Sequence, residues 1–354
     1  MKKIYIDAYF NTNLGDDLFL KILSERYNKK FISYVNPKKK YVNKFEKIKF
    51  NKSRILYISN KIFEKVLKIN IIESLIIKFS PLVIIIGGSM FIENNFSEKK
   101  YKKYANKNNK YILGVNFGPY KTKNYKEYIE KNIFQTSKDI CFREKNSFDK
   151  FKKNKNVRYA PDIVFSLKIN SNIKKSDKNV IISVINCDKR FENKINIQYQ
   201  ELIIELIKKF DKLKYNITLM SFCKNEGDEE AINKILENIN NENLKNKIKQ
   251  YNYRGNIEEA IRILENSRII VGSRFHANIL GLVMNKTILP IAYSDKTINT
   301  LKDISYKGKI IDIRKLEDFN VDDITEKDLN YKINIDKYRK EAEKHFEKLD
   351  KVLK

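Results

Sequence analysis

The sequence predicts an α/β protein with two halves, each holding a parallel sheet flanked by helices. Apolar, strand-like runs alternate with helix-like stretches along both halves. The run 82–86 is apolar throughout and ends in a Gly-Gly pair, and 110–116 repeats this pattern, as is typical of buried parallel strands. A length of 354 residues suits two domains better than one core.

The elements follow in chain order. In the first half we expect strands at 3–8, 31–35, 55–59, 82–86, 110–116 and 139–142, with helices at 16–27 and 147–153. In the second half we expect strands at 179–185, 216–222, 248–251, 268–271 and 287–293, with helices at 197–210, 228–238, 257–265 and 336–353. The segment 157–176, which holds a strand end, a proline and then a polar stretch, marks the junction. We therefore expect domains at 1–165 and 177–330, followed by a C-terminal helix at 331–354.

Composition narrows the class of protein. A hydrophobic content of 42% is that of a globular protein. The net charge of +28 has two open interpretations, namely a genome rich in A·T codons or weak attraction to anionic lipid or an acidic saccharide. Nucleic-acid binding is not indicated, because the lysines are scattered and no basic motif interleaved with aromatic residues occurs.

The three cysteines indicate whether the protein works in a reducing or an oxidising compartment. Cys141, Cys187 and Cys223 are odd in number and far apart, which favours reduced thiols over disulfides or a zinc site. The N-terminus lacks a signal pattern, and charged residues and a proline interrupt the apolar region 69–86. We expect a cytoplasmic protein, with a peripheral position at the inner face of the membrane left open.

The segment 271–296 carries the most specific chemical pattern. It reads as a strand, a Gly-Ser turn, a helix and a second strand, and it contains Ser273, Arg274 and His276. The start of a helix after a strand favours anions, because backbone N–H groups and the positive end of the dipole lie there. We expect a phosphate or carboxylate pocket with a titratable imidazole beside it. The alternative for His276 is a buried core histidine, whereas His345 in the charged terminal helix is expected to be solvated.

Further loops follow strands, and ligands of parallel sheets bind at the carboxyl ends of strands. We expect the loops at 11–17, 87–91, 118–120, 272–276 and 294–296 to face one cleft. Each has a plain structural alternative: helix capping, a small-residue turn or a surface lysine. The candidate ligand-binding residues in these loops are Asn13, Gly15, Asp16, Gly87, Gly88, Ser89 and Lys296.

Two charged residues near the junction have open roles. Arg143 follows a strand and either holds a ligand carboxylate through two hydrogen bonds or forms a surface salt bridge with Glu144 or Asp149. Asp162 either caps a turn or orients a catalytic histidine or arginine.

Taken in order, these motifs resemble the polysaccharide pyruvyl transferase family. The resemblance rests on Asn13-Leu14-Gly15-Asp16, IIIGGSMF, GVNFGPY, FREKNS, APDIVF, SRFHANILGL and YSDK, which together cover about residues 4 to 297. Ser89 stands where the family has a third glycine, Phe275 replaces a leucine, and Ser294 shifts the final motif.

The resemblance implies two Rossmann-like domains facing a cleft, as in B-type glycosyltransferases, with the acceptor on the N-terminal side and the donor on the C-terminal side. It implies transfer of pyruvate from phosphoenolpyruvate to a sugar of a cell-surface polysaccharide or its precursor, which is lipid-linked or free. The products are a pyruvate ketal and phosphate.

The residues fit this chemistry. Phosphoenolpyruvate carries a phosphate and a carboxylate, which Arg274, Arg143 and Lys296 could hold. His276 is the expected acid–base group, and Asp162 and Asp16 are candidates to activate or hold a hydroxyl. No cofactor or metal is expected beyond the co-substrate. The main alternative is a B-type glycosyltransferase that uses a nucleotide sugar, and a non-catalytic basic binding protein is a more distant one.

Overall fold

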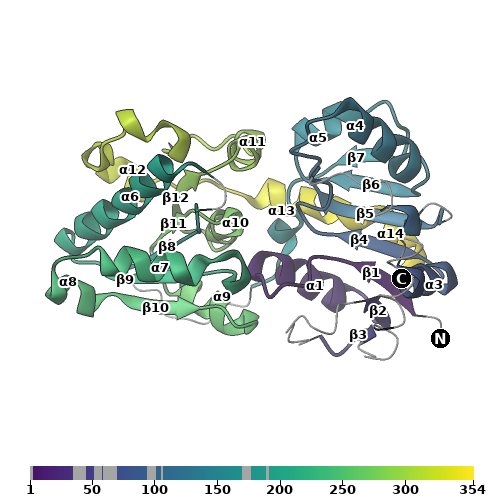
Figure 1. Cartoon of the computed structure of the whole chain (residues 1–354), viewed down its shortest axis with the longest axis horizontal. Helices are drawn as coiled ribbons and strands as arrows, with labels where there is room; N and C mark the ends of the chain where they lie inside the picture. The colour runs from purple at the N-terminus through teal and green to yellow at the C-terminus, as the bar shows by residue number, and fades with distance from the viewer. Residues whose placement is uncertain are drawn as a thin grey trace. The chain divides into compact units, whose positions relative to one another are not determined.

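A computed structural model of the chain describes residues 3–34, 45–51, 58, 70–93, 101–104, 107–169, 177–188 and 191–354. The chain divides into two compact units, each with its own sheet (Figure 1). Unit 1 comprises Met1–Phe10, Phe19–Ser166 and Lys340–Lys354, and unit 2 comprises Asn11–Leu18 and Leu167–Arg339. The main division at 166/167 falls within the expected junction. Each unit also contains a short segment from an end of the chain.

Unit 1 contains a seven-stranded parallel sheet in the order β3-β2-β1-β4-β5-β6-β7. Its strands are β1 (Ile4–Asp7), β2 (Phe31–Tyr34), β3 (Ile48–Asn51), β4 (Val83–Ile86), β5 (Lys110–Val115), β6 (Asp139–Phe142) and β7 (Val157–Tyr159). The helices around it include the later part of α1 (Leu14–Arg26), α3 (Ile71–Phe79), α4 (Lys123–Ile129), α5 (Lys145–Phe151) and α14 (Glu347–Leu353). The four residues of β4 are all buried, as the apolar run predicts.

Unit 2 contains a six-stranded parallel sheet in the order β10-β9-β8-β11-β12-β13. Its strands are β8 (Asn179–Ser183), β9 (Asn216–Ser221), β10 (Lys249–Asn252), β11 (Ile269–Gly272), β12 (Thr287–Ala292) and β13 (Ile311–Asp312). Its helices are α6 (Asn193–Lys212), α7 (Asp228–Glu237), α8 (Glu242–Lys247), α9 (Ile257–Glu265), α10 (Phe275–Val283), α11 (Asp295–Asp303) and α12 (Glu326–Asn330).

Both faces of the central strands of unit 2 are buried. Side chains of a strand alternate between the faces of the sheet. Val271 and Leu289 belong to the core cluster that contains the apolar stripe of α6. The intervening Ile270 and Ile288 contact the opposite layer, where they lie against Gly281 of α10. Helices therefore cover the central part of the sheet on two sides, which explains why these strands read as continuous apolar runs.

The predicted fold class, α/β with two parallel sheets flanked by helices, is confirmed. Most predicted elements lie within a few residues of their expected bounds, and the helix at 257–265 matches α9. The strand expected at 55–59 falls almost entirely outside the described residues, and the third strand of the sheet is β3 instead. No helix in the described ranges is long and apolar enough to cross a membrane.

The C-terminal segment differs from the prediction of a single helix with a solvated histidine. It consists of α13 (Asp336–Ala342), a 3-10 turn over Glu343–Phe346 and α14. His345 is fully buried in unit 1, and its Nε2 lies 2.8 Å from the carbonyl oxygen of Pro161. Burial, with the nearby guanidinium of Arg158, lowers the pKa of His345 to about 3. The expected solvation was wrong because this histidine lies on the apolar face that packs onto the sheet.

Candidate functional site

The strand order of unit 2 places one group of predicted residues at a topological switch point. Strands are added outward from β8 in one direction and from β11 in the other, so the loops after β8 and β11 diverge there. Such a point, at the carboxyl ends of strands, is where open α/β sheets bind ligands. Ser273 and Arg274 directly follow β11, and His276 lies in the first turn of α10.

The guanidinium of Arg274 is buried and held by two carboxylates of unit 2. Its Nε donates to Asp228 Oδ2 at 2.9 Å, its Nη2 donates to Asp228 Oδ1, and its Nη1 donates to Glu226 Oε2 at 2.6 Å. Burial by itself would lower the pKa of Arg274, but the two carboxylates raise it well above its usual value. The anion that a buried arginine requires is thus supplied, in this structure, by the protein.

A glycine of the N-terminal motif lies against the imidazole of His276. A Cβ atom at Gly15 would overlap that ring, so only glycine allows the start of α1 to approach so closely. Asn13 fixes this approach, since its Oδ1 accepts a hydrogen bond from Gly15 N at 3.0 Å. The motif therefore caps a helix, as one interpretation held, and also determines where the imidazole lies. His276 itself is 9% exposed.

The two acidic residues of that motif differ in their surroundings. Asp17 is buried, and its Oδ2 accepts a hydrogen bond from the hydroxyl of Tyr253 at 2.6 Å. Asp16 is half-buried in the first turn of α1. Of the two, Asp16 is therefore the more accessible to solvent.

Two further predicted residues frame the same edge of unit 2. Ser273 is buried, and its Oγ accepts a hydrogen bond from Tyr199 at 2.9 Å, so its hydroxyl helps to fix the turn after β11. Lys296, half-buried at the start of α11, places its Nζ 4.4 Å from the centre of the Phe275 ring. Phe275 in turn packs edge-on against the His276 ring, with the ring centres 5.0 Å apart. The phenylalanine that departs from the family pattern thus contacts both the predicted cation and the predicted acid.

The remaining predicted charges belong to unit 1. Arg143 and Asp162 are both fully buried, and Arg143 Nη1 donates to Asp162 Oδ2 at 3.0 Å. Nη2 of the arginine donates to Asn116 Oδ1 at 2.7 Å. The surface salt bridge with Glu144 or Asp149 was therefore the wrong alternative. Asp162 caps a turn, as one interpretation held, because its Oδ1 accepts a hydrogen bond from Val164 N at 2.9 Å while its Oδ2 holds Arg143.

The glycine turn after β4 packs on this buried pair. A Cβ at Gly88 would overlap the guanidinium of Arg143. The carbonyl of Gly88 accepts a hydrogen bond from Asn116 N at 2.7 Å, which ties the turn to the loop after β5. Gly87 has φ of 141°, a conformation that favours glycine, whereas Ser89 is exposed. The motif of unit 1 thus fixes the backbone at the carboxyl edge of its sheet.

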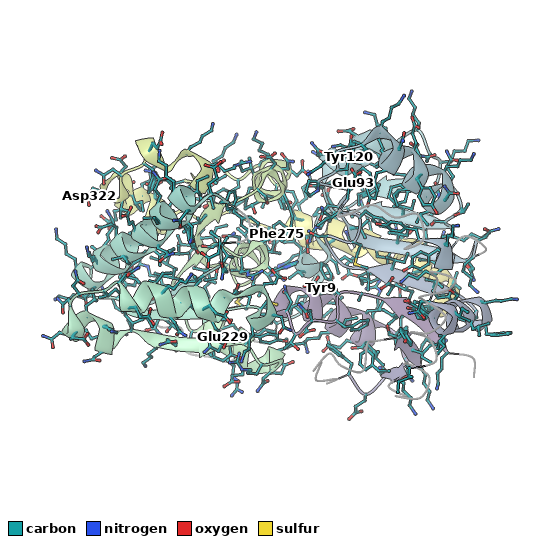
Figure 2. All side chains as sticks on the ribbon, in the orientation of Figure 1. Tyr9, Glu93, Tyr120, Glu229, Phe275 and Asp322 are labelled. Atoms are coloured by element: carbon teal, nitrogen blue, oxygen red, sulfur yellow. The ribbon has the colours of Figure 1, made fainter. Side chains whose placement is uncertain are left out.

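A groove of about 530 Å³ lies beside the loops that follow β4 and β5. Glu93 forms part of its wall, where its carboxylate accepts hydrogen bonds from Thr122 N at 2.8 Å and Thr122 Oγ1 at 2.6 Å. Tyr120 and Glu93 are marked in Figure 2. The groove is lined by Glu93, Thr122, Asn124, Glu127, Tyr128, Lys131 and Asn132.

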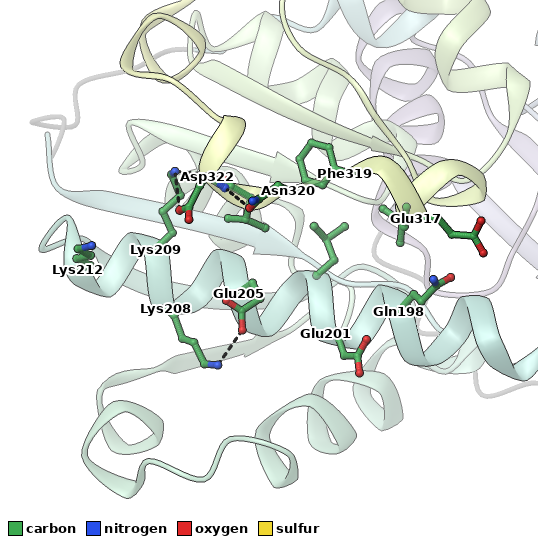
Figure 3. Close-up of a pocket in the computed structure, with 13 residues that line it drawn as sticks. Gln198, Glu201, Glu205, Lys208, Lys209, Lys212, Glu317, Phe319, Asn320 and Asp322 are labelled. Atoms are coloured by element: carbon green, nitrogen blue, oxygen red, sulfur yellow. Dashed lines mark hydrogen bonds and ion pairs between the residues drawn. The ribbon is translucent and has the colours of Figure 1, made fainter.

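A second groove, of about 610 Å³, lies between α6 and the turns at 313–323 in unit 2 (Figure 3). Its walls carry charges of both signs, including Lys208 beside Glu205 at 2.8 Å and Lys209 beside Asp322 at 3.9 Å. None of the predicted site residues lines it. Within the described part of the chain, no group of three or more His, Cys, Asp or Glu side chains is arranged to hold a metal ion.

The family model for polysaccharide pyruvyl transferases matches residues 13–295. The chain belongs to this family. The match extends from the Asn13 motif in unit 2, through the glycine turns of unit 1, to the start of α11. A comparison with curated proteins found no match.

Solved structures agree with the fold of this pyruvyl transferase family member. UDP-GlcNAc 2-epimerase from Methanocaldococcus jannaschii, in complex with UDP-GlcNAc and UDP, is 12% identical, with 99% of each chain covered and a TM-score of 0.58. The corresponding epimerase from Neisseria meningitidis is 10% identical, with 99% of this chain and 98% of that chain covered and a TM-score of 0.54. At such identity the likeness establishes the fold alone, a pair of Rossmann-like units of the B-type glycosyltransferase kind.

Sequence reasoning missed several residues that shape the site. Glu226 and Asp228, the partners of Arg274, read as an ordinary acidic helix start after β9. Ser183, whose Oγ accepts a hydrogen bond from Arg274 N at 3.1 Å, and Tyr199 lie in apolar segments. Of these residues, only Ser183 carried a sequence signal for a site, because it is a polar residue near the carboxyl end of a predicted strand.

Proposed function

We propose that this pyruvyl transferase moves the pyruvyl group of phosphoenolpyruvate onto two hydroxyls of a saccharide and releases phosphate. The proposal is supported most directly by His276, which the Gly15 backbone contacts at the switch point of unit 2. An imidazole held at the N-terminus of a helix, beside a cation such as Lys296, suits a reaction that needs both a proton donor and an anion site. The acceptor is a sugar of a cell-surface polysaccharide or its precursor.

In the proposed reaction, His276 donates a proton to the methylene carbon of phosphoenolpyruvate, which leaves an oxocarbenium-like carbon 2. One acceptor hydroxyl forms a bond to carbon 2 and loses its proton. The bond between carbon 2 and the phosphate oxygen breaks, and the second hydroxyl adds in its place to close the ketal. Of the two hydroxyl protons, one returns to His276 and the other leaves with phosphate. General acid–base help of this kind contributes about 10²- to 10⁴-fold in rate.

The donor's anionic groups require cations and N–H donors. In unit 2 these are Lys296, Arg274 and the first turn of α10. Arg143 and Asp162 receive a scaffolding role in this proposal, because both are fully buried and paired with each other. We further propose that the groove around Tyr128 in unit 1 binds acceptor sugar, since it combines an aromatic ring with carboxylates and amides.

The decisive experiment incubates the purified protein with phosphoenolpyruvate and a panel of saccharides, and follows phosphate release and the mass of each saccharide. We expect one saccharide class to gain the mass of a pyruvate ketal with matching phosphate release. His276→Ala should remain folded and lose about 10²-fold or more of the rate.

Thermal stabilisation by candidate donors separates this proposal from a nucleotide-sugar transferase. Phosphoenolpyruvate should raise the melting temperature, and UDP-sugars should not. Stabilisation by a nucleotide sugar without any effect of phosphoenolpyruvate would refute the proposal, as would near-native turnover by His276→Ala.

A further inference from the structure

The two carboxylates that hold Arg274 are not equivalent. Asp228 is completely buried and receives both Nε and Nη2 of the guanidinium. Its Oδ2 also accepts hydrogen bonds from the backbone N–H groups of Phe222 and Cys223, each at 2.9 Å. Removing Asp228 would leave several buried donors without acceptors, so it is a fixed anchor for the arginine.

Glu226 is held much more loosely. It accepts a hydrogen bond from Nη1 of the guanidinium, and its side chain is 21% exposed, against 0% for Asp228. Its other oxygen accepts a long hydrogen bond from Asn13 Nδ2 at 3.3 Å. Glu226 ends a one-turn helix and is followed by Gly227, which has φ of 87°. A single charge-assisted bond at the edge of a site can be exchanged for an equivalent bond to another anion.

The charge balance favours this exchange when an anionic substrate binds at Arg274. One guanidinium faces two carboxylates, so the three side chains together carry a net charge of −1. A phosphate or carboxylate that approached Nη1 would be repelled by Glu226 at contact distance. This electrostatic repulsion disappears if the incoming anion takes the place of the Glu226 carboxylate at Nη1.

We propose that Asp228 and Glu226 are positioning residues for Arg274 with separate tasks: Asp228 anchors the guanidinium, and Glu226 is an internal anion that releases Nη1 to an anionic group of the donor. The inference rests on the proposed function for the identity of the donor, but the exchange itself requires only an anion. It links donor binding to the segment 222–227, and through Asn13 to the motif that places His276.

The test compares Glu226→Gln with Glu230→Gln in the full chain. Both variants remove one negative charge from the same region, but Glu230 is exposed and forms no bond to Arg274. Affinity for inorganic phosphate and for phosphoenolpyruvate is measured by calorimetry, and kcat and KM are measured for phosphoenolpyruvate. We expect Glu226→Gln to tighten the binding of both anions by about fivefold or more and to lower KM, whereas Glu230→Gln changes neither.

Asp228→Asn tests the other half of the proposal. It should lower the melting temperature more than Glu226→Gln does and should not tighten anion binding, because the guanidinium then loses its anchor. Unchanged or weakened phosphate binding in Glu226→Gln would overturn the exchange, as would equal tightening in Glu230→Gln or no binding of either anion by any of these proteins. Tighter phosphate binding without use of phosphoenolpyruvate would support the exchange while rejecting the proposed function.

Discussion

Gly15 determines how closely helix α1 approaches His276, the proposed catalytic residue. Glycine inside a helix costs up to about 1 kcal/mol relative to alanine, so its presence in α1 needs a reason. The reason is the imidazole of His276, which occupies the space that a Cβ would take. Glycine lowers the stability of this helical turn, but it allows the backbone of α1 to contact the imidazole of His276.

We predict that Gly15→Ala lowers the rate of phosphate release by about 10²-fold, because the added methyl group displaces the imidazole from its proposed position. The melting temperature should fall, because forcing a methyl group against the buried imidazole costs about 1–3 kcal/mol, which exceeds the gain of alanine in the helix. Ser24→Ala, in the same helix, is the control and should be active. A Gly15→Ala protein with full activity would show that this contact does not place the imidazole.

The pair Arg143–Asp162 gives a second prediction for single residues. Removing one partner of a buried ion pair costs about 3–5 kcal/mol, so Arg143→Met and Asp162→Leu should each lower the free energy of unfolding by this amount. The double variant should lose less than the sum of the two. Denaturant titration measures all three against Lys152→Ala.

Lys152 forms an exposed pair with Asp149, and each side chain is 57% exposed. Loss of such a pair should change stability by no more than about 0.5 kcal/mol. Equal effects of the buried and the exposed substitutions would contradict the scaffolding role of Arg143.

Among the elements, the C-terminal segment is the least expected part of unit 1. Arg26 Nε donates to Asp350 Oδ1 at 2.9 Å and Nη2 donates to Asp350 Oδ2 at 2.6 Å, which ties α1 to α14. The guanidinium also lies 4.5 Å from the centre of the Phe346 ring. Phe346 and Leu349 are completely buried. The C-terminal segment, although rich in exposed lysines, therefore buries one apolar face, and His345 in the 3-10 turn lies on that face.

The burial of His345 predicts an acid-sensitive fold. Its folded-state pKa of about 3 lies below the value of about 6.5 in an unfolded chain, so the unfolded state binds the proton first as the pH falls. The stability due to the neutral imidazole is complete above about pH 6.5 and is lost progressively down to about pH 3. Arg158 and Arg143 are the positive groups that oppose its protonation.

We predict that the free energy of unfolding falls more steeply between pH 6.5 and 4 in the wild type than in His345→Gln. The difference should approach about 1.4 kcal/mol per pH unit within that window. Carboxylates titrate equally in both proteins, so the difference isolates the histidine. Parallel pH profiles would mean that His345 is accessible to protons in the folded state.

For the whole molecule, the net charge of +28 predicts a general attraction to anionic surfaces. We expect weak binding to vesicles that contain anionic lipid at low ionic strength, and none to neutral vesicles. High salt should release the protein, because the charges involved are exposed. If anionic vesicles leave turnover of a soluble saccharide unchanged, the charge reflects composition and not catalysis.

The sequence by itself determined the fold class, most of the strands and the motifs of the family. Buried parallel strands need apolar residues on both faces, and glycine turns leave a direct mark at their ends. These signals are local, and the segments 82–88 and 269–276 could therefore be recognised without any knowledge of their neighbours. Family membership followed from the order of the same motifs.

Only the tertiary structure decided which side chains meet. Asp228 is more than forty residues from Arg274 in sequence, and Gly15 is farther still from His276, yet both pairs are in contact. Nothing in the local pattern distinguishes Asp228 from a helix-start aspartate, or His345 from a surface histidine. Which side chains contact each other depends on the order of the strands and the packing of the helices. The charges around a buried residue come from segments that are distant in sequence and that the sheet brings together.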